Sequence, residues 1–165
     1  MDVGAMADLS QGDLRAQQSL ALRELIARLR AVGSPYWDVK LRDVGRIEAI
    51  EDVTSLPFTV KKEFRDTYPS GMLAVPMGDV VRVHASSGTS GKPTIVAYTA
   101  ADVAVFAEVN ARSLALAGAT PESIVHVAYG YGLFTGGLGL HFGVEALGAT
   151  AVPASGGNPG FQVGL

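Results

Sequence analysis

Residues 86–93 read S-S-G-T-S-G-K-P, and they separate two runs rich in β-branched residues, V-V-R-V-H-A at residues 80–85 and T-I-V-A-Y at residues 94–98. Such residues favour strands, whereas a run of small and hydroxyl-bearing residues favours a turn. The pattern therefore predicts a hairpin whose two strands are joined by this loop.

The composition of the loop indicates a phosphate ligand. Glycine lets a backbone come close to a ligand, and successive N–H groups form a nest for an anion. Hydroxyl groups and an ammonium group supply further donors. We therefore expect the loop to bind the phosphates of a nucleotide through Ser86, Ser87, Gly88, Thr89, Ser90, Gly91 and Lys92.

Two other interpretations of the loop were weighed. A Walker A motif requires G-x-x-x-x-G-K-[ST], but Ser86 stands where the first glycine belongs and Pro93 follows the lysine. A glycine-rich turn without a ligand is the other alternative. Seven consecutive residues of phosphate-binding type argue against that alternative.

The residues before the hairpin predict a helical segment. We expect residues 1–11 to form a flexible leader and residues 12–79 a helical N-terminal segment. Apolar residues recur there at spacings of three and four, which is typical of an amphipathic helix over residues 12–32. They are Leu14, Leu20, Leu22, Leu25, Ile26 and Leu29, beside an arginine-rich face that we interpret as solvated.

The residues from the hairpin onward predict an α/β domain over residues 80–165. Strands are expected at residues 80–83, 94–98, 123–128 and 149–153, with helices over residues 100–116 and 138–147. Alternation of strands and helices favours a parallel or mixed sheet with crossover helices. Ligands of such sheets bind beyond the carboxyl ends of the strands, where residues 129–137 and 154–158 lie.

Composition excludes several classes of function. A net charge of −3 gives no electrostatic basis for binding nucleic acid or an anionic membrane, and no cysteine is present. The three histidines are not at the spacing of metal ligands, so no metal site is expected. Without a signal peptide or an apolar run long enough to span a bilayer, we expect a soluble cytoplasmic protein.

The chain resembles the phenylacetate-CoA ligases of the adenylate-forming acyl-CoA synthetase superfamily. The loop is similar to their phosphate loop, usually written S-S-G-T-T-G-K-P, with Ser90 where threonine is commoner. Three further stretches carry the resemblance in family order. They read L-P-F-T-V-K-K-E-F-R-D-T-Y-P at residues 56–69, A-Y-G-Y-G-L-F-T-G-G-L-G-L-H-F-G at residues 128–143 and P-A-S-G-G-N at residues 153–158.

The resemblance implies a function and a set of binding residues. It implies activation of phenylacetate with ATP, which brings Mg²⁺, to an acyl-adenylate, followed by transfer to CoA. The predicted aryl pocket comprises Tyr129, Tyr131, Phe134 and Leu140. A possible nucleotide contact comprises Ser155, Gly156 and Gly157, although these residues could equally form a simple turn.

The resemblance also implies that this chain matches only the N-terminal part of the family. Beyond Arg112 the only charged side chains besides histidine are Glu122 and Glu145, which is unusual for a solvated surface. We therefore expect an incomplete domain that lacks catalytic residues and is inactive alone. Alternatives are a related enzyme with another acid, or a non-catalytic nucleotide-binding module completed by a partner chain. A homodimer is also compatible with the sequence.

Overall fold

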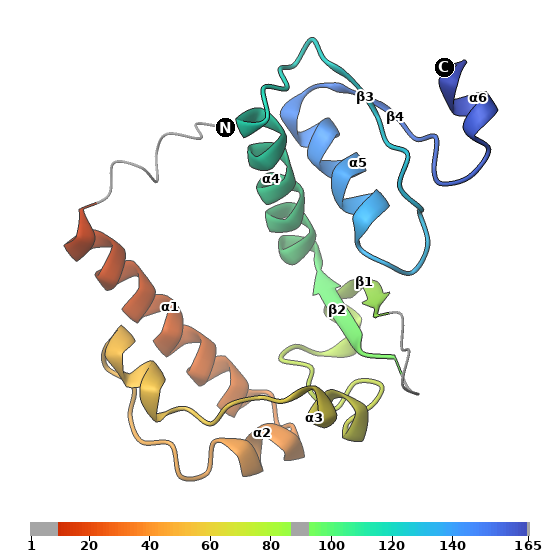
Figure 1. The fold of residues 1–165 in the computed structure, drawn as a ribbon. Coiled ribbons are helices and arrows are strands. Elements are labelled where there is room, and N and C mark those ends of the chain that lie inside the picture. Colours follow the sequence, from red (N-terminus) through yellow and green to blue (C-terminus); the bar gives the residue numbers. More distant parts are fainter. Residues whose placement is uncertain (1–9, 87–92, 165) are drawn as a thin grey trace. The chain divides into compact units, whose positions relative to one another are not determined.

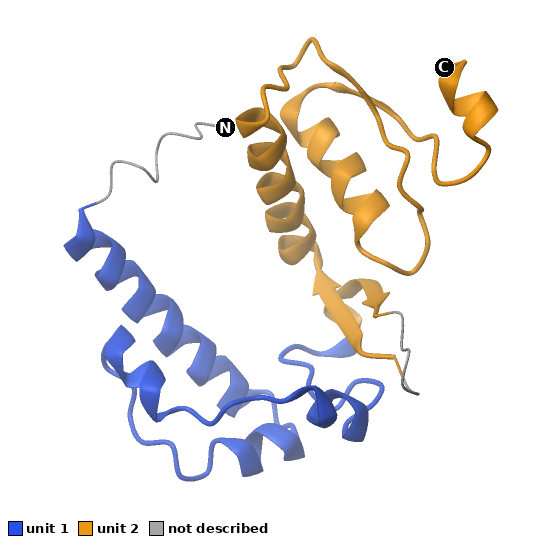
Figure 2. Cartoon of the chain, in the orientation of Figure 1, with its two compact units in different colours: residues 1–77 blue, residues 78–165 orange. Residues whose placement is uncertain are grey.

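The computed structural model describes residues 10–86 and 93–164. It divides into two compact units, residues 1–77 and residues 78–165, which Figure 2 colours separately. Among the described residues, helices make up the first unit, and the strands β1 to β4 belong to the second; Figure 1 labels these elements. This mixture of helices and strands confirms the predicted α/β class.

The first unit is built around a long helix, α1 (Gln11–Ala31). Leu22, Ile26 and Leu29 of α1 are buried at spacings of four and three, and Leu41 and Ile47 complete the core. The predicted amphipathic helix is therefore confirmed, but its buried face is narrower than expected. The other predicted apolar positions, Leu14, Leu20 and Leu25, are exposed, because the elements of this unit pack against only one side of α1.

Short helices follow α1 in the first unit. They are α2 (Pro35–Lys40), the 3₁₀ helix η1 (Ile50–Ser55) and α3 (Lys61–Asp66). The start of α3 is held by Glu63, a residue of its own first turn. The Glu63 carboxylate accepts a hydrogen bond of 2.7 Å from the Val60 N–H and one of 2.5 Å from Lys40 Nζ. A side chain inside the first turn therefore satisfies the helix terminus.

The second unit begins with the predicted hairpin. After the 3₁₀ helix η2 (Met77–Asp79), strand β1 (Val80–Ala85) pairs with β2 (Ile95–Thr99) in antiparallel register, which confirms the hairpin. Thr99 then caps helix α4 (Ala100–Leu116), where its side chain and that of Asp102 each accept a backbone N–H of the other. This reciprocal cap fixes the start of α4.

A parallel pair of strands completes the second unit. Strand β3 (Ile124–His126) and β4 (Thr150–Val152) pair in parallel, and α5 (Gly136–Leu147) connects them. Among the described residues β2 pairs with β1 and not with β3, so two small sheets replace the single sheet that alternation suggested. The order of strands along a chain does not determine which strands become neighbours in a sheet.

Helices α4 and α5 pack closely because α5 carries glycines at the contact. A Cβ atom at Gly143 would lie 2.5 Å from Cβ of Asn110, and one at Gly139 would lie 2.8 Å from the Phe106 ring. Gly139 and Gly143 are buried and one turn apart, so they form one face of α5. The short helix α6 (Pro159–Val163) follows β4.

Candidate functional site

The base of the predicted phosphate loop is a closed hairpin end. The Ser86 N–H donates to the Thr94 carbonyl at 2.9 Å, and the Thr94 N–H donates to Ser86 Oγ at 3.0 Å. Ser86 is thus already engaged within the protein. The remaining predicted phosphate ligands lie outside the described residues, so their role stays a prediction: Ser87, Gly88, Thr89, Ser90, Gly91 and Lys92.

The end of β1 is bound to a distant loop through one carbonyl group. The Leu133 oxygen lies 3.0 Å from the Ala85 amide nitrogen and 3.1 Å from Nδ1 of His84. A carbonyl oxygen can only accept, so His84 carries a proton on Nδ1. The His84 ring is buried, with the Tyr98 ring edge-on at 5.4 Å between centroids. This histidine therefore joins the base of the phosphate loop to residues 129–135.

Tyr129 and the glycines after it explain how the aromatic loop folds. A Cβ atom at Gly136 would lie 2.4 Å from the Tyr129 ring, and one at Gly137 would lie 2.5 Å from the Gly130 carbonyl oxygen. Both glycines therefore allow the loop to lie directly on the start of α5. Leu140 is one turn after Gly136, on the side of α5 that the Tyr129 ring covers. It is half-buried.

The predicted aromatic residues differ in exposure. Tyr129 and Phe134 keep 59% and 48% of their surfaces accessible, whereas Tyr131 is half-buried. Large exposed aromatic side chains are costly in water, so these two rings are available to bind an apolar ligand. The predicted pocket residues thus lie on one loop and the first turns of α5.

Tyr131 belongs to a line of three polar groups that the sequence did not indicate. Its hydroxyl oxygen lies 3.2 Å from Nδ1 of His141, and Nε2 of His141 lies 3.2 Å from a carboxylate oxygen of Glu145. Burial first, and then the nearby Glu145 carboxylate, raise the pKa of the Tyr131 hydroxyl above its ordinary value. From the sequence, His141 was assigned no role, and only its i, i+4 spacing to Glu145 hinted at this contact.

The second predicted loop is tightly folded beside the first. Ser155 and Gly157 have positive φ angles of 63° and 90°. Their carbonyl oxygens accept hydrogen bonds from Nε2 of Gln162, at 2.8 and 2.5 Å. A Cβ atom at Gly156 would be 3.9 Å from the Gly130 amide nitrogen. The two loops that follow β3 and β4 therefore lie side by side, as the parallel topology predicts.

The structure thus brings three of the predicted segments together. The Leu133 carbonyl joins the aromatic loop to the base of the phosphate loop, and Gly156 lies against Gly130 of the same aromatic loop. The aromatic loop therefore contacts both the end of β1, where the predicted phosphate loop begins, and the loop that follows β4.

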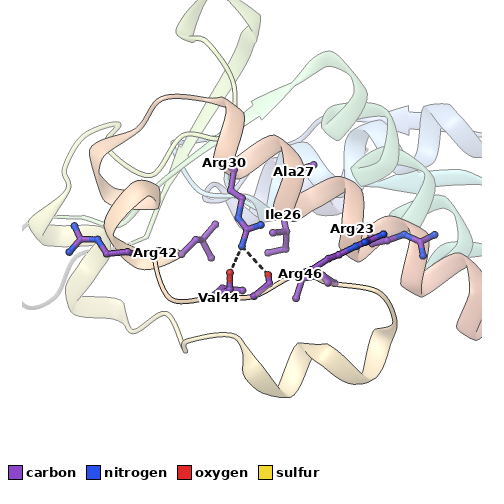
Figure 3. A pocket seen from close by; sticks show the side chains of 10 residues that line it. Arg23, Ile26, Ala27, Arg30, Arg42, Val44 and Arg46 are labelled. Atoms are coloured by element: carbon purple, nitrogen blue, oxygen red, sulfur yellow. Dashed lines mark hydrogen bonds between the residues drawn. The ribbon is translucent and has the colours of Figure 1, made fainter.

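Several arginine side chains gather around a pocket in the first unit. It has a volume of about 520 Å³, and arginines from α1 and from the 41–47 connector line it. Figure 3 shows Arg30 pointing into this pocket and donating to the carbonyls of Val44 and Gly45, while Arg42 points away. Arg23 donates to the Glu48 carbonyl, and Arg46 forms an ion pair with the carboxylate of that residue. These donors hold the connector against α1.

The described residues contain neither a cluster of potential metal ligands nor a membrane-spanning helix. Within residues 10–86 and 93–164 there is no group of three His, Cys, Asp or Glu residues arranged to hold a metal ion. In the same residues no helix combines the length and the apolar character needed to cross a bilayer.

Curated relatives align with nearly the whole of this chain. The chain is 53% identical over 161 residues to a phenylacetate-coenzyme A ligase of Thermus thermophilus, a match that covers 95% of this chain and 36% of the relative. It is 45% identical to the phenylacetate-coenzyme A ligase of Aromatoleum evansii, over 99% of this chain and 38% of the relative. The chain therefore spans about a third of the length of these relatives. No family model matches the chain.

Solved structures show the same fold. A 2-hydroxyisobutyryl-CoA ligase in complex with 2-HIB-AMP and CoA superposes with a TM-score of 0.80 at 26% identity, covering 92% of this chain and 34% of the ligase. The resemblance to phenylacetate-CoA ligases inferred from motifs is therefore confirmed by relatives, and the fold by a structure of an acyl-CoA ligase.

Proposed function

We propose that this chain forms the acid-binding and phosphate-binding part of a phenylacetate-CoA ligase. The observation that carries the proposal is the convergence at Leu133, whose carbonyl links the base of the phosphate loop to the aromatic loop. The similarity to curated phenylacetate-coenzyme A ligases supports phenylacetate as the acid.

The proposed reaction has two steps. A carboxylate oxygen of the acid attacks the α-phosphorus of ATP, the bond to the β-phosphate breaks, and pyrophosphate leaves. The thiol sulfur of CoA then attacks the acyl carbon, loses its proton, and displaces AMP. Catalysis of this kind depends on holding the reactants in line and on stabilising the charge of the phosphates. Mg²⁺ bound to ATP would neutralise part of that negative charge.

The residues divide the work in this proposal. Lys92, the N–H and hydroxyl groups of residues 87–91, and the hydroxyl of Ser86, which keeps its own proton to donate, bind the β- and γ-phosphates and the leaving pyrophosphate. Tyr129 and Phe134 hold the aryl ring. Leu140, one helical turn after Gly136 on α5, bounds the same pocket. Gln162 occupies the carbonyls of Ser155 and Gly157, which fixes the second loop for contact with the nucleotide.

The complete reaction requires more protein than this chain contains, in our proposal. The chain spans only about a third of the length of these relatives. The chain offers no carboxylate cluster for Mg²⁺ among its described residues. We therefore propose that the chain alone binds nucleotide or acid without turnover, that it works in the cytoplasm, and that no catalytic residue lies within it.

The test is exchange of labelled pyrophosphate into ATP in the presence of phenylacetate. It is run on the 165-residue chain and on the complete protein that contains it. We expect exchange in the complete protein, and a rate at least about 100-fold lower in Lys92→Ala, which removes a phosphate-binding charge. Lys61→Ala, at an exposed position of α3, is the matched control.

Three outcomes would contradict parts of the proposal. Exchange by the 165-residue chain alone would show that no further segment or partner chain is needed. Exchange with another acid but not with phenylacetate would assign a different substrate. Nucleotide binding without exchange in any form would favour a non-catalytic binding module.

A further inference from the structure

A connected line of polar groups joins the aromatic loop to helix α5. Tyr131 lies on the loop, and His141 and Glu145 lie one turn apart on α5. The Tyr131 and His141 rings meet edge-on, with centroids 5.7 Å apart, and the hydroxyl oxygen is 3.2 Å from Nδ1. Ring packing and a polar contact therefore hold the same pair of side chains.

The Glu145 carboxylate determines which way the hydrogen bonds run. It lies 3.2 Å from Nε2 of His141, and an ionised carboxylate can only accept. Nε2 therefore carries the proton of the neutral ring, and Nδ1 has a free lone pair. The Tyr131 hydroxyl must then be the donor to Nδ1.

Along the loop, the contact of Tyr131 lies between two other contacts. The Tyr129 ring lies on Gly136, and the Leu133 carbonyl is bound to His84 and Ala85. Between them Tyr131 is bound to His141. Without this bond the hydroxyl of the half-buried Tyr131 would have no acceptor for its proton. The segment between the exposed rings of Tyr129 and Phe134 would then lose one of the contacts that fix its position.

We propose that His141 is a positioning residue for acid binding, and that Glu145 holds it in the tautomer whose Nδ1 accepts a hydrogen bond from the Tyr131 hydroxyl. His141 acts through Tyr131 and touches neither substrate nor reacting atoms. The inference rests on the proposed function, because the loop it positions is the one assigned to the aryl group.

Two substitutions of His141 separate the two contacts. The Oδ1 atom of asparagine is as many bonds from Cα as Nδ1 of histidine, so His141→Asn keeps an acceptor for Tyr131. The amide of glutamine reaches only the place of Nε2, so His141→Gln keeps the contact with Glu145 and loses the one with Tyr131. Tyr131→Phe removes the hydroxyl, and His126→Gln at an exposed site of β3 is the control.

The first measurement is phenylacetate-dependent pyrophosphate exchange in the complete protein. We expect His141→Gln and Tyr131→Phe each to raise KM for phenylacetate by about 3- to 10-fold, the factor that corresponds to one lost hydrogen bond, with kcat and KM for ATP unchanged. His141→Asn should stay near wild type. Combining Tyr131→Phe with His141→Gln should add little. Equal effects of asparagine and glutamine, or a fall in kcat with KM unchanged, would overturn the proposal.

The second measurement does not depend on activity. With ¹⁵N-labelled histidine, the ring nitrogens of His141 should report an unprotonated Nδ1 and a protonated Nε2 when the ring is neutral. The opposite tautomer would overturn the proposal. If the wild-type protein exchanges no pyrophosphate with any aryl acid, the proposed function fails, and the tautomer then decides alone whether His141 positions Tyr131.

Discussion

Nδ1 of His84 lies 3.1 Å from the carbonyl oxygen of Leu133, although 49 residues separate the two in the chain. His84 is the penultimate residue of β1, immediately before Ala85 and the loop assigned to phosphates, and Leu133 precedes the exposed ring of Phe134. One buried imidazole therefore couples the position of the phosphate loop to that of the aromatic loop.

Replacing His84 should destabilise the second unit. His84→Ala removes a buried ring and a donor to Leu133, so we expect a loss of about 2–4 kcal/mol in the free energy of unfolding. His84→Asn keeps a donor in the place of Nδ1 and should lose less. Urea unfolding measures both. The exposed His126→Ala should change little, and an equal loss there would refute a special role for His84.

Helix packing should be sensitive to one methyl group on α5. Gly143→Ala would place Cβ 2.5 Å from Cβ of Asn110, so α4 and α5 would have to separate. We expect a cost of about 1–3 kcal/mol in thermal or urea unfolding. Gly12→Ala in the first turn of α1, where the nearest atom is 3.7 Å away, is the control and should be neutral or mildly stabilising. A neutral Gly143→Ala would contradict the close packing.

Stability of the first unit should depend on pH through Lys40 and Glu63. The hydrogen bond from Lys40 lowers the pKa of Glu63, and the same bond raises the pKa of Lys40. The contribution of Glu63 is therefore present above the ordinary carboxyl pKa and lost as pH falls through its lowered pKa. That of Lys40 is present below the ordinary lysine pKa and lost as pH rises through its raised one.

Lys40→Met should flatten the acid limb of this profile, measured as the midpoint of thermal unfolding against pH. Lys62→Met is the matched control, because Lys62 pairs with Asp66 at the surface of the same unit. Identical acid limbs in wild type and Lys40→Met would show that the pair contributes nothing there.

The Tyr131 hydroxyl should titrate at a lower pH when the charge of Glu145 is removed. The carboxylate is the second cause of the raised pKa of Tyr131, after burial, so Glu145→Gln should lower that pKa only in part. Carbon-13 labelling at the tyrosine Cζ position follows Tyr131 separately from the other tyrosines. Glu122→Gln, in the turn before β3, should leave it unchanged, and a similar shift in both variants would contradict the assignment.

Phe134 should control affinity for the acid. Phe134→Ala removes an exposed ring that we assign to the aryl pocket, so KM for phenylacetate should rise by about 10- to 100-fold, as expected for loss of one buried aromatic contact. Leu116→Ala is the control, because Leu116 of α4 is 84% exposed. An unchanged KM in Phe134→Ala would remove this residue from the pocket.

Much of the fold was predictable because its signals are local. The β-branched runs on both sides of the glycine-rich loop indicated the β1–β2 hairpin, which the antiparallel register confirms. The parallel pairing of β3 with β4 followed from a strand, a helix and a second strand in sequence. Motif order also indicated the resemblance to phenylacetate-CoA ligases, which the identity to curated relatives confirms.

Other features depended on packing between distant residues. From the sequence, β2 was expected in one sheet with β3, whereas among the described residues β2 pairs only with β1. Leu14, Leu20 and Leu25 fit the period of a buried face but are exposed, because period does not reveal how much of a helix is covered. Residue types alone did not indicate that Tyr131 would meet His141.

The sequence by itself determined most helices and strands of this protein and the ligases it resembles, and it predicts a phosphate-binding loop. Those depend on hydrogen-bonding residues close in the chain and on the spacing of apolar side chains. Only the tertiary structure decided that His84 would hold Leu133, that Tyr129 would lie on Gly136 and that Gly156 would lie against Gly130. Such contacts form where buried surfaces fit together, and that fit depends on the whole arrangement of elements rather than on any local pattern.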